Sequence, residues 1–99
     1  MLKRYEVLLK AMKEMNDPSA WGILDRKNRL IELCGDKFDV DVNISLRTTL
    51  YGYHLEYSQI YVAIHLDQLP PRIVPFVADP VERQNVVETV HEWLYEEID

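Results

Sequence analysis

The strictest pattern in the chain is the alternation of apolar and polar residues over FDVDVNISLR, from Phe38 to Arg47. The apolar residues stand at even positions and the polar residues at odd positions. Successive side chains of a β-strand point to opposite faces of the sheet, so this period of two predicts a strand with one buried and one solvated face. Such a strand needs partners, and we therefore expect a sheet at the centre of the fold.

The two apolar segments that follow keep the period of two but differ in phase. In YGYHLEY (51–57) the apolar residues are at odd positions, and in IYVAIHL (60–66) they are at even positions. A single strand would turn half of these side chains into water. We therefore expect a hairpin that reverses at Ser58-Gln59 or in a longer turn around it, with Tyr53 opposite Ile64. In this register the tyrosines of 51–57 belong to the core.

Two other segments have helical spacing. From Leu2 to Met15, apolar residues recur every three or four positions, which predicts an amphipathic helix. The last helix is expected to begin after Asp79, a natural N-cap that is followed by Pro80 at the first helical position. Its apolar stripe runs to Leu94.

The remaining segments complete the predicted topology. Trp21–Leu24 and Arg29–Leu33 flank a polar turn and predict a further hairpin. Asp67 to Ala78 contains three prolines, which cannot donate to a sheet ladder, so we expect an extended surface connection. The whole pattern predicts an α+β fold with a single domain over residues 1–99. It is a two-layer sandwich of an N-terminal helix, an antiparallel meander of four or five strands and a C-terminal helix.

Charge is unevenly distributed along the chain, whose net charge is −6. The first fifty residues carry nine Lys or Arg and eight Asp or Glu, whereas residues 51–99 carry only Arg72 and Arg83 against nine acids. Phosphate backbones attract clustered Lys and Arg, so this half disfavours direct nucleic-acid binding. An acidic surface favours a basic partner instead.

Features that indicate a compartment are few. Cys34 is the single cysteine, which fits a reducing environment. The N-terminal segment lacks the apolar run of a signal peptide, and no apolar stretch is long enough to span a membrane. We expect a cytoplasmic protein.

Acidic residues gather on one face of the predicted last helix and just beyond it. Glu88, Glu92 and Glu96 follow one another at intervals of four residues, and Glu97 and Asp99 come next. Like charges at this spacing repel, and carboxylates near a helix C-terminus oppose the helix dipole. One interpretation is a docking surface for a basic partner, at its extreme a mimic of nucleic-acid charge. The alternative is an ordinary solvated helix end.

The polar sheet face offers two further candidates. Tyr61 is expected to point to this face, where it could contact a partner. The expected register also places Asp41 opposite Glu56, with Asp39 and His54 close by. Oxygen ligands of this kind could hold a divalent cation, although exposed acids that splay into water explain the pattern equally well.

These features predict a small acidic, non-catalytic binding protein without a cofactor. It would act by protein–protein contact, as an inhibitor or adaptor that occupies a basic, nucleic-acid-binding site of its partner. Two alternatives stay open. One is a metal-assisted hydrolase that uses the carboxylates and histidine of the sheet face. The other is a structural module that self-associates, for example as a homodimer.

Overall fold

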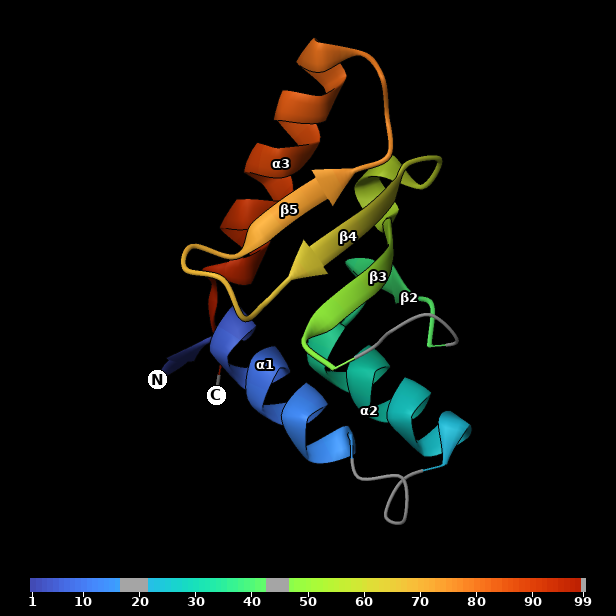
Figure 1. Ribbon diagram of the computed structural model, residues 1–99, viewed down its shortest axis with the longest axis vertical. Coiled ribbons are helices and arrows are strands. Elements are labelled where there is room, and N and C mark those ends of the chain that lie inside the picture. Colours follow the sequence, from blue (N-terminus) through green and yellow to red (C-terminus); the bar gives the residue numbers. More distant parts are fainter. Residues whose placement is uncertain (17–21, 43–46, 99) are drawn as a thin grey trace.

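The computed structural model describes residues 1–16, 22–42 and 47–98, which form three helices and two antiparallel sheets (Figure 1). The helices are α1 (Arg4–Met15), α2 (Ile23–Cys34) and α3 (Pro80–Leu94), and η1 (Leu55–Tyr57) is a 3-10 turn. The main sheet has the order β2 (Phe38–Val40), β3 (Thr49–His54), β4 (Tyr61–His65) and β5 (Arg72–Pro75). The predicted α+β class, the antiparallel meander and the helices before and after it are confirmed.

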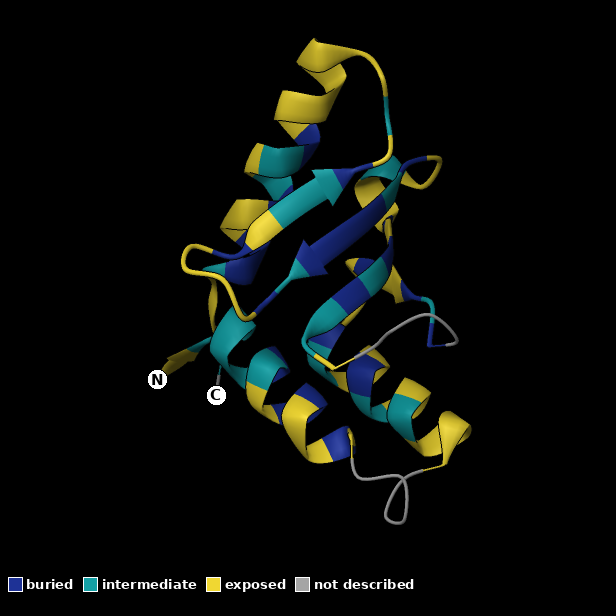
Figure 2. Cartoon of the chain, viewed as in Figure 1, coloured by how far each residue is buried: buried dark blue, intermediate teal, exposed yellow. Residues whose placement is uncertain are grey.

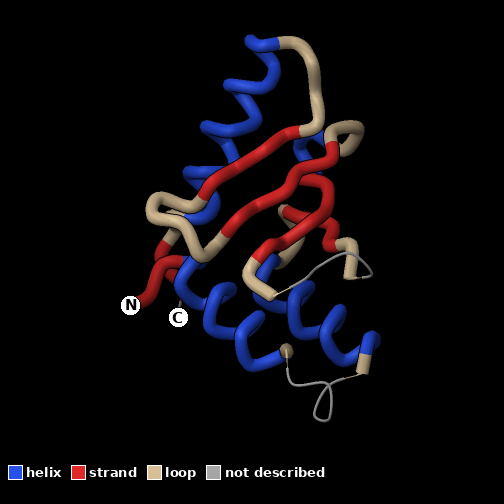
Figure 3. Tube along the Cα trace, in the orientation of Figure 1, coloured by secondary structure: helices blue, strands red, loops and turns tan. Residues whose placement is uncertain are grey.

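The second sheet joins the two ends of the chain. β1 (Leu2–Lys3) pairs with β6 (Glu97–Ile98), with Leu2 opposite Ile98 (Figure 3). The Lys3 backbone N–H donates to the Glu6 carboxylate at the start of α1. The first predicted helix therefore begins at Arg4, because Leu2 and Lys3 belong to this short strand pair.

The helices leave one face of the main sheet uncovered. Figure 1 shows α3 behind β5, and α1 and α2 packed against each other beside the sheet. Inward side chains of the sheet, among them Phe38, Leu50 and Ile64, form the core with α3 residues such as Val90 and Trp93. The first turns of α3 extend past the sheet and are exposed, and its buried residues begin at Val86 (Figure 2).

The start of α3 follows the sequence prediction. The Asp79 side chain accepts a hydrogen bond from the Val81 backbone N–H at 3.1 Å, and Pro80 occupies the first helical position. The cap satisfies a donor that the helix itself leaves without a partner, and the proline ring presets the backbone angle.

The predicted hairpin over Trp21–Leu33 is wrong, because Ile23–Cys34 is helix α2; Trp21 itself lies outside the described residues. Leu30 and Cys34, four positions apart, are its buried residues, and Ile23 and Leu24 are exposed. Short apolar runs fit a strand and a helix equally well. The polar residues that resembled a turn are on the solvated side of this helix, which is capped by Gly35 with a φ of 67°.

The long alternating strand is shorter than predicted. Strand β2 covers Phe38–Val40, and the Asp41 backbone N–H still donates to the Tyr51 carbonyl at 2.8 Å. Residues 43–46 lie outside the described part of the chain. The ladder places Phe38 opposite His54 and Asp39 opposite Tyr53, so the predicted pairing of Asp41 with Glu56 is wrong.

The predicted register of the next hairpin is also wrong. Tyr53 pairs with Tyr61 rather than with Ile64, because η1 and the residues after it connect β3 to β4 in place of a two-residue turn. This longer connection shifts the phase by an odd number of residues, which exchanges the two faces of β3. Tyr51 and Tyr53 therefore point outward, and His54 points into the core with 1% of its surface exposed.

Gly52 shows why β3 takes this phase. A Cβ atom at Gly52 would lie 2.1 Å from the Asp39 carbonyl oxygen and 2.6 Å from Cε1 of Phe38. The space above Gly52 is filled by the Phe38 ring, which stacks on Trp93 at a centroid distance of 5.5 Å. A side chain at position 52 would have to displace both the neighbouring strand and this ring.

The segment from Asp67 to Ala78 contains an element that was not predicted. Residues Arg72–Pro75 form β5 at the edge of the sheet, with Val74 opposite Ala63 and Pro75 opposite Val62. An edge strand tolerates proline because half of its backbone groups have no ladder partner. Pro70 and Pro71 precede this strand, and Pro75 is tolerated within it because β5 is at the edge of the sheet.

Gly52→Ala is expected to lower the free energy of unfolding by about 2 kcal/mol or more, because the added methyl group overpacks the contact with β2 and Phe38. Urea denaturation followed by circular dichroism measures the change. Gly22→Ala is the matched control, since the nearest atom to its new Cβ is Asp25 Oδ2 at 3.6 Å. Gly22→Ala should lower the free energy of unfolding by about 1 kcal/mol or less. Equal losses in both variants would contradict the close contact at Gly52.

Candidate binding surfaces

Four aromatic side chains share the uncovered face of the main sheet, and we call this group the aromatic face: Tyr51, Tyr53, Tyr61 and Phe76. Tyr53 is directly opposite Tyr61, and the Phe76 backbone N–H donates to the Tyr61 carbonyl at 2.7 Å. These three residues thus form a row across the sheet. Tyr61 lies 4.9 Å from Tyr53, 5.7 Å from Phe76 and 6.4 Å from Tyr51 between ring centroids.

The aromatic face is partly open to solvent. Tyr53 is 38% exposed and Phe76 is 59% exposed, whereas Tyr51 and Tyr61 are half-buried beneath them. Isolated exposed aromatic residues are ordinary on protein surfaces, but a contiguous group of four rings is typical of a contact surface. The contact role suggested by the sequence for Tyr61 stays a prediction. Its ring has three aromatic neighbours on this face, two of which had been predicted as core residues. Tyr57, the third predicted core tyrosine, does pack against the core.

Two carboxylates flank this face on β2 and just after it. Asp39 is exposed and lies opposite Tyr53 in the ladder. Asp41 accepts a hydrogen bond from the Tyr61 hydroxyl at 3.3 Å. Both carboxylates line a hollow of about 380 Å³ with Tyr53, Ile23 and Lys27. The aromatic face therefore borders a hollow that contains two acids.

Burial and the Asp41 carboxylate raise the pKa of Tyr61 to about 12. Burial is the larger cause, since it disfavours the phenolate, and the nearby negative charge adds to it. The hydroxyl thus stays protonated and holds Asp41 in place across the physiological pH range.

The acidic helix face is divided between different roles. Glu88 and Glu92 are exposed on α3, and Glu88 accepts a hydrogen bond from the Gln84 side chain at 3.2 Å. Glu96 is paired with Arg4 at 2.7 Å, and Glu97 lies in β6 opposite Lys3. Asp99 lies outside the described residues. Only Glu88 and Glu92 therefore remain as an exposed pair on the helix itself.

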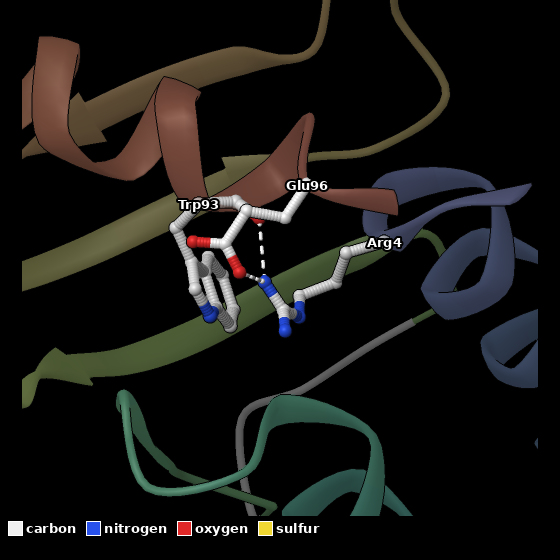
Figure 4. Close-up of polar contacts among 3 residues, drawn as sticks. All are labelled: Arg4, Trp93 and Glu96. Carbon is white, nitrogen blue, oxygen red and sulfur yellow. Dashed lines mark hydrogen bonds and ion pairs between the residues drawn. The ribbon is translucent and has the colours of Figure 1, made fainter. Parts of the chain in front are cut away.

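Arg4 provides the cation that the end of α3 lacks in its own sequence (Figure 4). Its guanidinium donates to the Trp93 carbonyl at 2.7 Å and lies over the Trp93 ring at 5.1 Å. The side chain is only 12% exposed. The carbonyls at a helix C-terminus favour a positive charge, so Arg4 offsets the unfavourable position of Glu96. The sequence did not predict the contact of Arg4 with the end of α3, because Arg4 comes from the opposite end of the chain.

A second hollow lies between α3 and the end of β3, and we call it the His54 hollow. It has a volume of about 140 Å³, and its lining includes His54, Trp93, Lys37, Glu56, Glu92 and Glu96. His54 and Trp93 are buried, and the other four residues are exposed. Burial lowers the pKa of His54, while Glu56 opposes this effect and Lys37 adds to it. The imidazole is thereby held in its neutral form at neutral pH.

The predicted metal cluster is not brought together. Asp39 and Asp41 line one hollow, whereas His54 and Glu56 line the other. Among the residues that the structure describes, no group of three or more His, Cys, Asp or Glu side chains is close enough to hold a metal ion. The reason is the register of β3, which turns His54 to the face opposite Asp39.

Comparison with known proteins finds no protein-family model, no curated protein and no solved structure that matches this chain. None of the described helices is long and apolar enough to cross a membrane.

The contact between Asp41 and Tyr61 is open to a direct test. Asp41→Asn should lower the pKa of Tyr61 part of the way back towards its ordinary value, since burial, the larger cause, remains. NMR titration of ring-labelled tyrosine measures the pKa of Tyr61, and Asp39→Asn should leave this pKa unchanged. A pKa unaffected by Asp41→Asn would contradict the contact.

The raised pKa of Tyr61 also predicts how stability depends on pH. The folded protein holds the Tyr61 proton more tightly than the unfolded chain does, so the free energy of unfolding should fall between about pH 10 and 12.

The role of Arg4 predicts a stability difference between two arginines. Arg4→Met should cost about 1–3 kcal/mol of unfolding free energy, because it removes a charged hydrogen bond to a buried carbonyl. Arg29 forms an exposed pair with Glu32 at 3.4 Å, and Arg29→Met should change stability by about 0.5 kcal/mol or less. Urea denaturation of both variants provides the comparison. Equal effects would show that Arg4 does not hold α3.

Proposed function

We propose that this protein is a non-catalytic binding protein that holds a basic segment of a partner protein on its aromatic face. The observation that carries the proposal is the row of Tyr53, Tyr61 and Phe76 on a sheet face that no described helix crosses (Figure 1). Exposure of these rings to water is unfavourable, and a partner that covers them removes that cost.

The chemistry of the face favours arginine in the partner. A guanidinium group stacks on aromatic rings and also forms paired hydrogen bonds with a carboxylate. Asp39 is exposed next to Tyr53, and Asp41 lies next to Tyr61. The net charge of −6 attracts a basic partner over a longer range.

The same charges disfavour a nucleic acid as the partner. Exposed aromatic rings on a sheet can stack with bases, but such surfaces also need positive charge to hold the phosphates. Here the hollow that borders the rings is lined by two carboxylates, Asp39 and Asp41, against one lysine, Lys27. We therefore propose that the protein acts as an inhibitor or adaptor, whose partner presents a basic segment that would otherwise bind nucleic acid. We place this activity in the cytoplasm, where Cys34 stays reduced.

The proposal is tested with a random peptide library selected on the immobilised full chain. We expect the selected peptides to be enriched in arginine. The double variant Tyr53→Ser, Phe76→Ser should weaken the best peptide by about tenfold or more, because aromatic contacts dominate such interfaces. Isothermal titration calorimetry measures the affinity. Tyr61 is left intact because its hydroxyl holds Asp41.

The matched control is Leu69→Ser. Leu69 is 80% exposed and lies between β4 and β5, whereas the row of Tyr53, Tyr61 and Phe76 crosses the opposite end of β4. This variant removes one exposed apolar side chain outside the aromatic face and should leave the affinity unchanged.

Two outcomes would overturn the proposal. If Glu88→Lys, Glu92→Lys abolishes binding and the aromatic variant retains it, the acidic face of α3 is the binding surface. Glu96 is left out of that variant because its reversal would break the pair with Arg4. If the chain instead self-associates in sedimentation experiments and the aromatic variant is monomeric, the aromatic face is a homodimer contact.

A further inference from the structure

Two residues that line the His54 hollow each carry a buried polar atom without a partner in the part of the chain that the structure describes. Nδ1 of His54 and Nε1 of Trp93 have no hydrogen-bond partner within the described chain, and the two residues are 1% and 2% exposed. Their rings meet edge to face at 6.0 Å. Buried polar side chains in folded proteins nearly always have a partner, and a group that lacks one indicates a bound molecule or water. Both side chains line the same hollow.

The charges around the hollow come in both signs. Glu56 follows β3 and Glu92 lies on α3, so carboxylates approach from two elements, while Lys37 comes from the residue before β2. Glu96 is already paired with Arg4. The indole N–H of Trp93 can only donate a hydrogen bond. A molecule that fits these groups carries a cation for the two glutamates and an anionic acceptor for Lys37 and Trp93.

The size of the hollow limits that molecule. A cavity of about 150 Å³ holds roughly six non-hydrogen atoms in the form of benzene, and this hollow measures about 140 Å³. Nucleotide cofactors are too large for it, since pockets for ligands of drug size begin at about 300 Å³. A free phosphate or sulfate ion would satisfy Lys37 but would face the glutamates. A small zwitterion satisfies both signs of charge.

We infer that the His54 hollow binds a free α-amino acid. Its ammonium group lies between Glu56 and Glu92, and its carboxylate accepts hydrogen bonds from Lys37 and from the Trp93 indole N–H. His54 supplies a further polar contact through Nδ1. This site is independent of the aromatic face, which lies on the other side of the sheet.

The experiment uses the full chain labelled with ¹⁵N and a panel of free L-amino acids up to about 10 mM, which is roughly ten times the upper end of usual substrate affinities. We expect at least one amino acid to move the Trp93 indole N–H signal in a saturable way, because that group gains an acceptor. The matching amine without the carboxylate and the matching acid without the ammonium group should each bind about tenfold more weakly or worse.

Two variants test which side chains contact the ammonium group and the carboxylate of the amino acid. Glu92→Gln should weaken binding of the amino acid by about tenfold or more, and Lys37→Met should do the same. Glu88→Gln is the matched control, one helical turn before Glu92 and equally exposed to solvent, and it should have no effect. These side chains are exposed, so the variants are expected to fold as the parent chain does.

The inference is overturned if no amino acid moves the Trp93 signal, in which case only water occupies the hollow. It is also overturned if Glu88→Gln weakens binding as much as Glu92→Gln does. The variant Tyr53→Ser, Phe76→Ser should bind the amino acid normally. Failure of this site and failure of the aromatic face as a partner surface can therefore be told apart.

Discussion

The position of α3 depends on one arginine that comes from the other end of the chain. Arg4 lies at the start of α1, and its guanidinium holds both the carbonyl of Trp93 and the carboxylate of Glu96. The Trp93 ring in turn stacks on Phe38 and meets His54 edge to face. Burial of a charge is costly unless the charge is paired. The Arg4 guanidinium pairs with Glu96, donates to a carbonyl at a helix terminus and lies over the Trp93 ring, while its buried Nε has no hydrogen-bond partner among the described residues. The core of the sheet is therefore closed by a polar contact as well as by apolar packing.

The sheet has two faces with different requirements. The inner face packs on the helices, so its residues are fixed by the space available, as Gly52 and Phe38 show. The outer face has no such constraint, and a stable surface there would be polar. The chain instead places Tyr53, Tyr61 and Phe76 on it. That departure from the expected pattern is the strongest indication of function in the molecule.

Local signals in the sequence predicted the elements that depend on local chemistry. The cap at Asp79 and the apolar stripe from Leu2 to Met15 are properties of neighbouring residues, and both helices were predicted, the first with its start at Leu2 in place of Arg4. Helix α2 was missed because its apolar residues occur in two short runs that fit either structure. The register of β3 was missed because a turn of 3-10 helix at 55–57 is decided by packing and leaves no clear sequence signal.

The wrong register of β3 changed the predicted placement of the carboxylate and histidine cluster and of the tyrosines. It put His54 beside Asp41 on the polar face and put Tyr53 in the core, and the structure reverses both placements. Tyr61 was placed correctly because the phase of β4 was read correctly on its own. The pairing of Arg4 with Glu96 joins residues from opposite ends of the chain, and no pattern within a segment could have indicated it.

The pairing of β1 with β6 also determines how the molecule would respond to a mechanical load. Leu2 is opposite Ile98 and Lys3 is opposite Glu97 in an antiparallel ladder, so a force that pulls the two ends apart acts on one rung at a time. A short ladder loaded in this way opens from its end, because its hydrogen bonds are weak individually and break one after another. The next contacts in line are the backbone bond from Arg4 to Glu96 and their ion pair. Tension on the ends would thus reach the contacts of Arg4 with Glu96 and Trp93 before it reaches the four-stranded sheet.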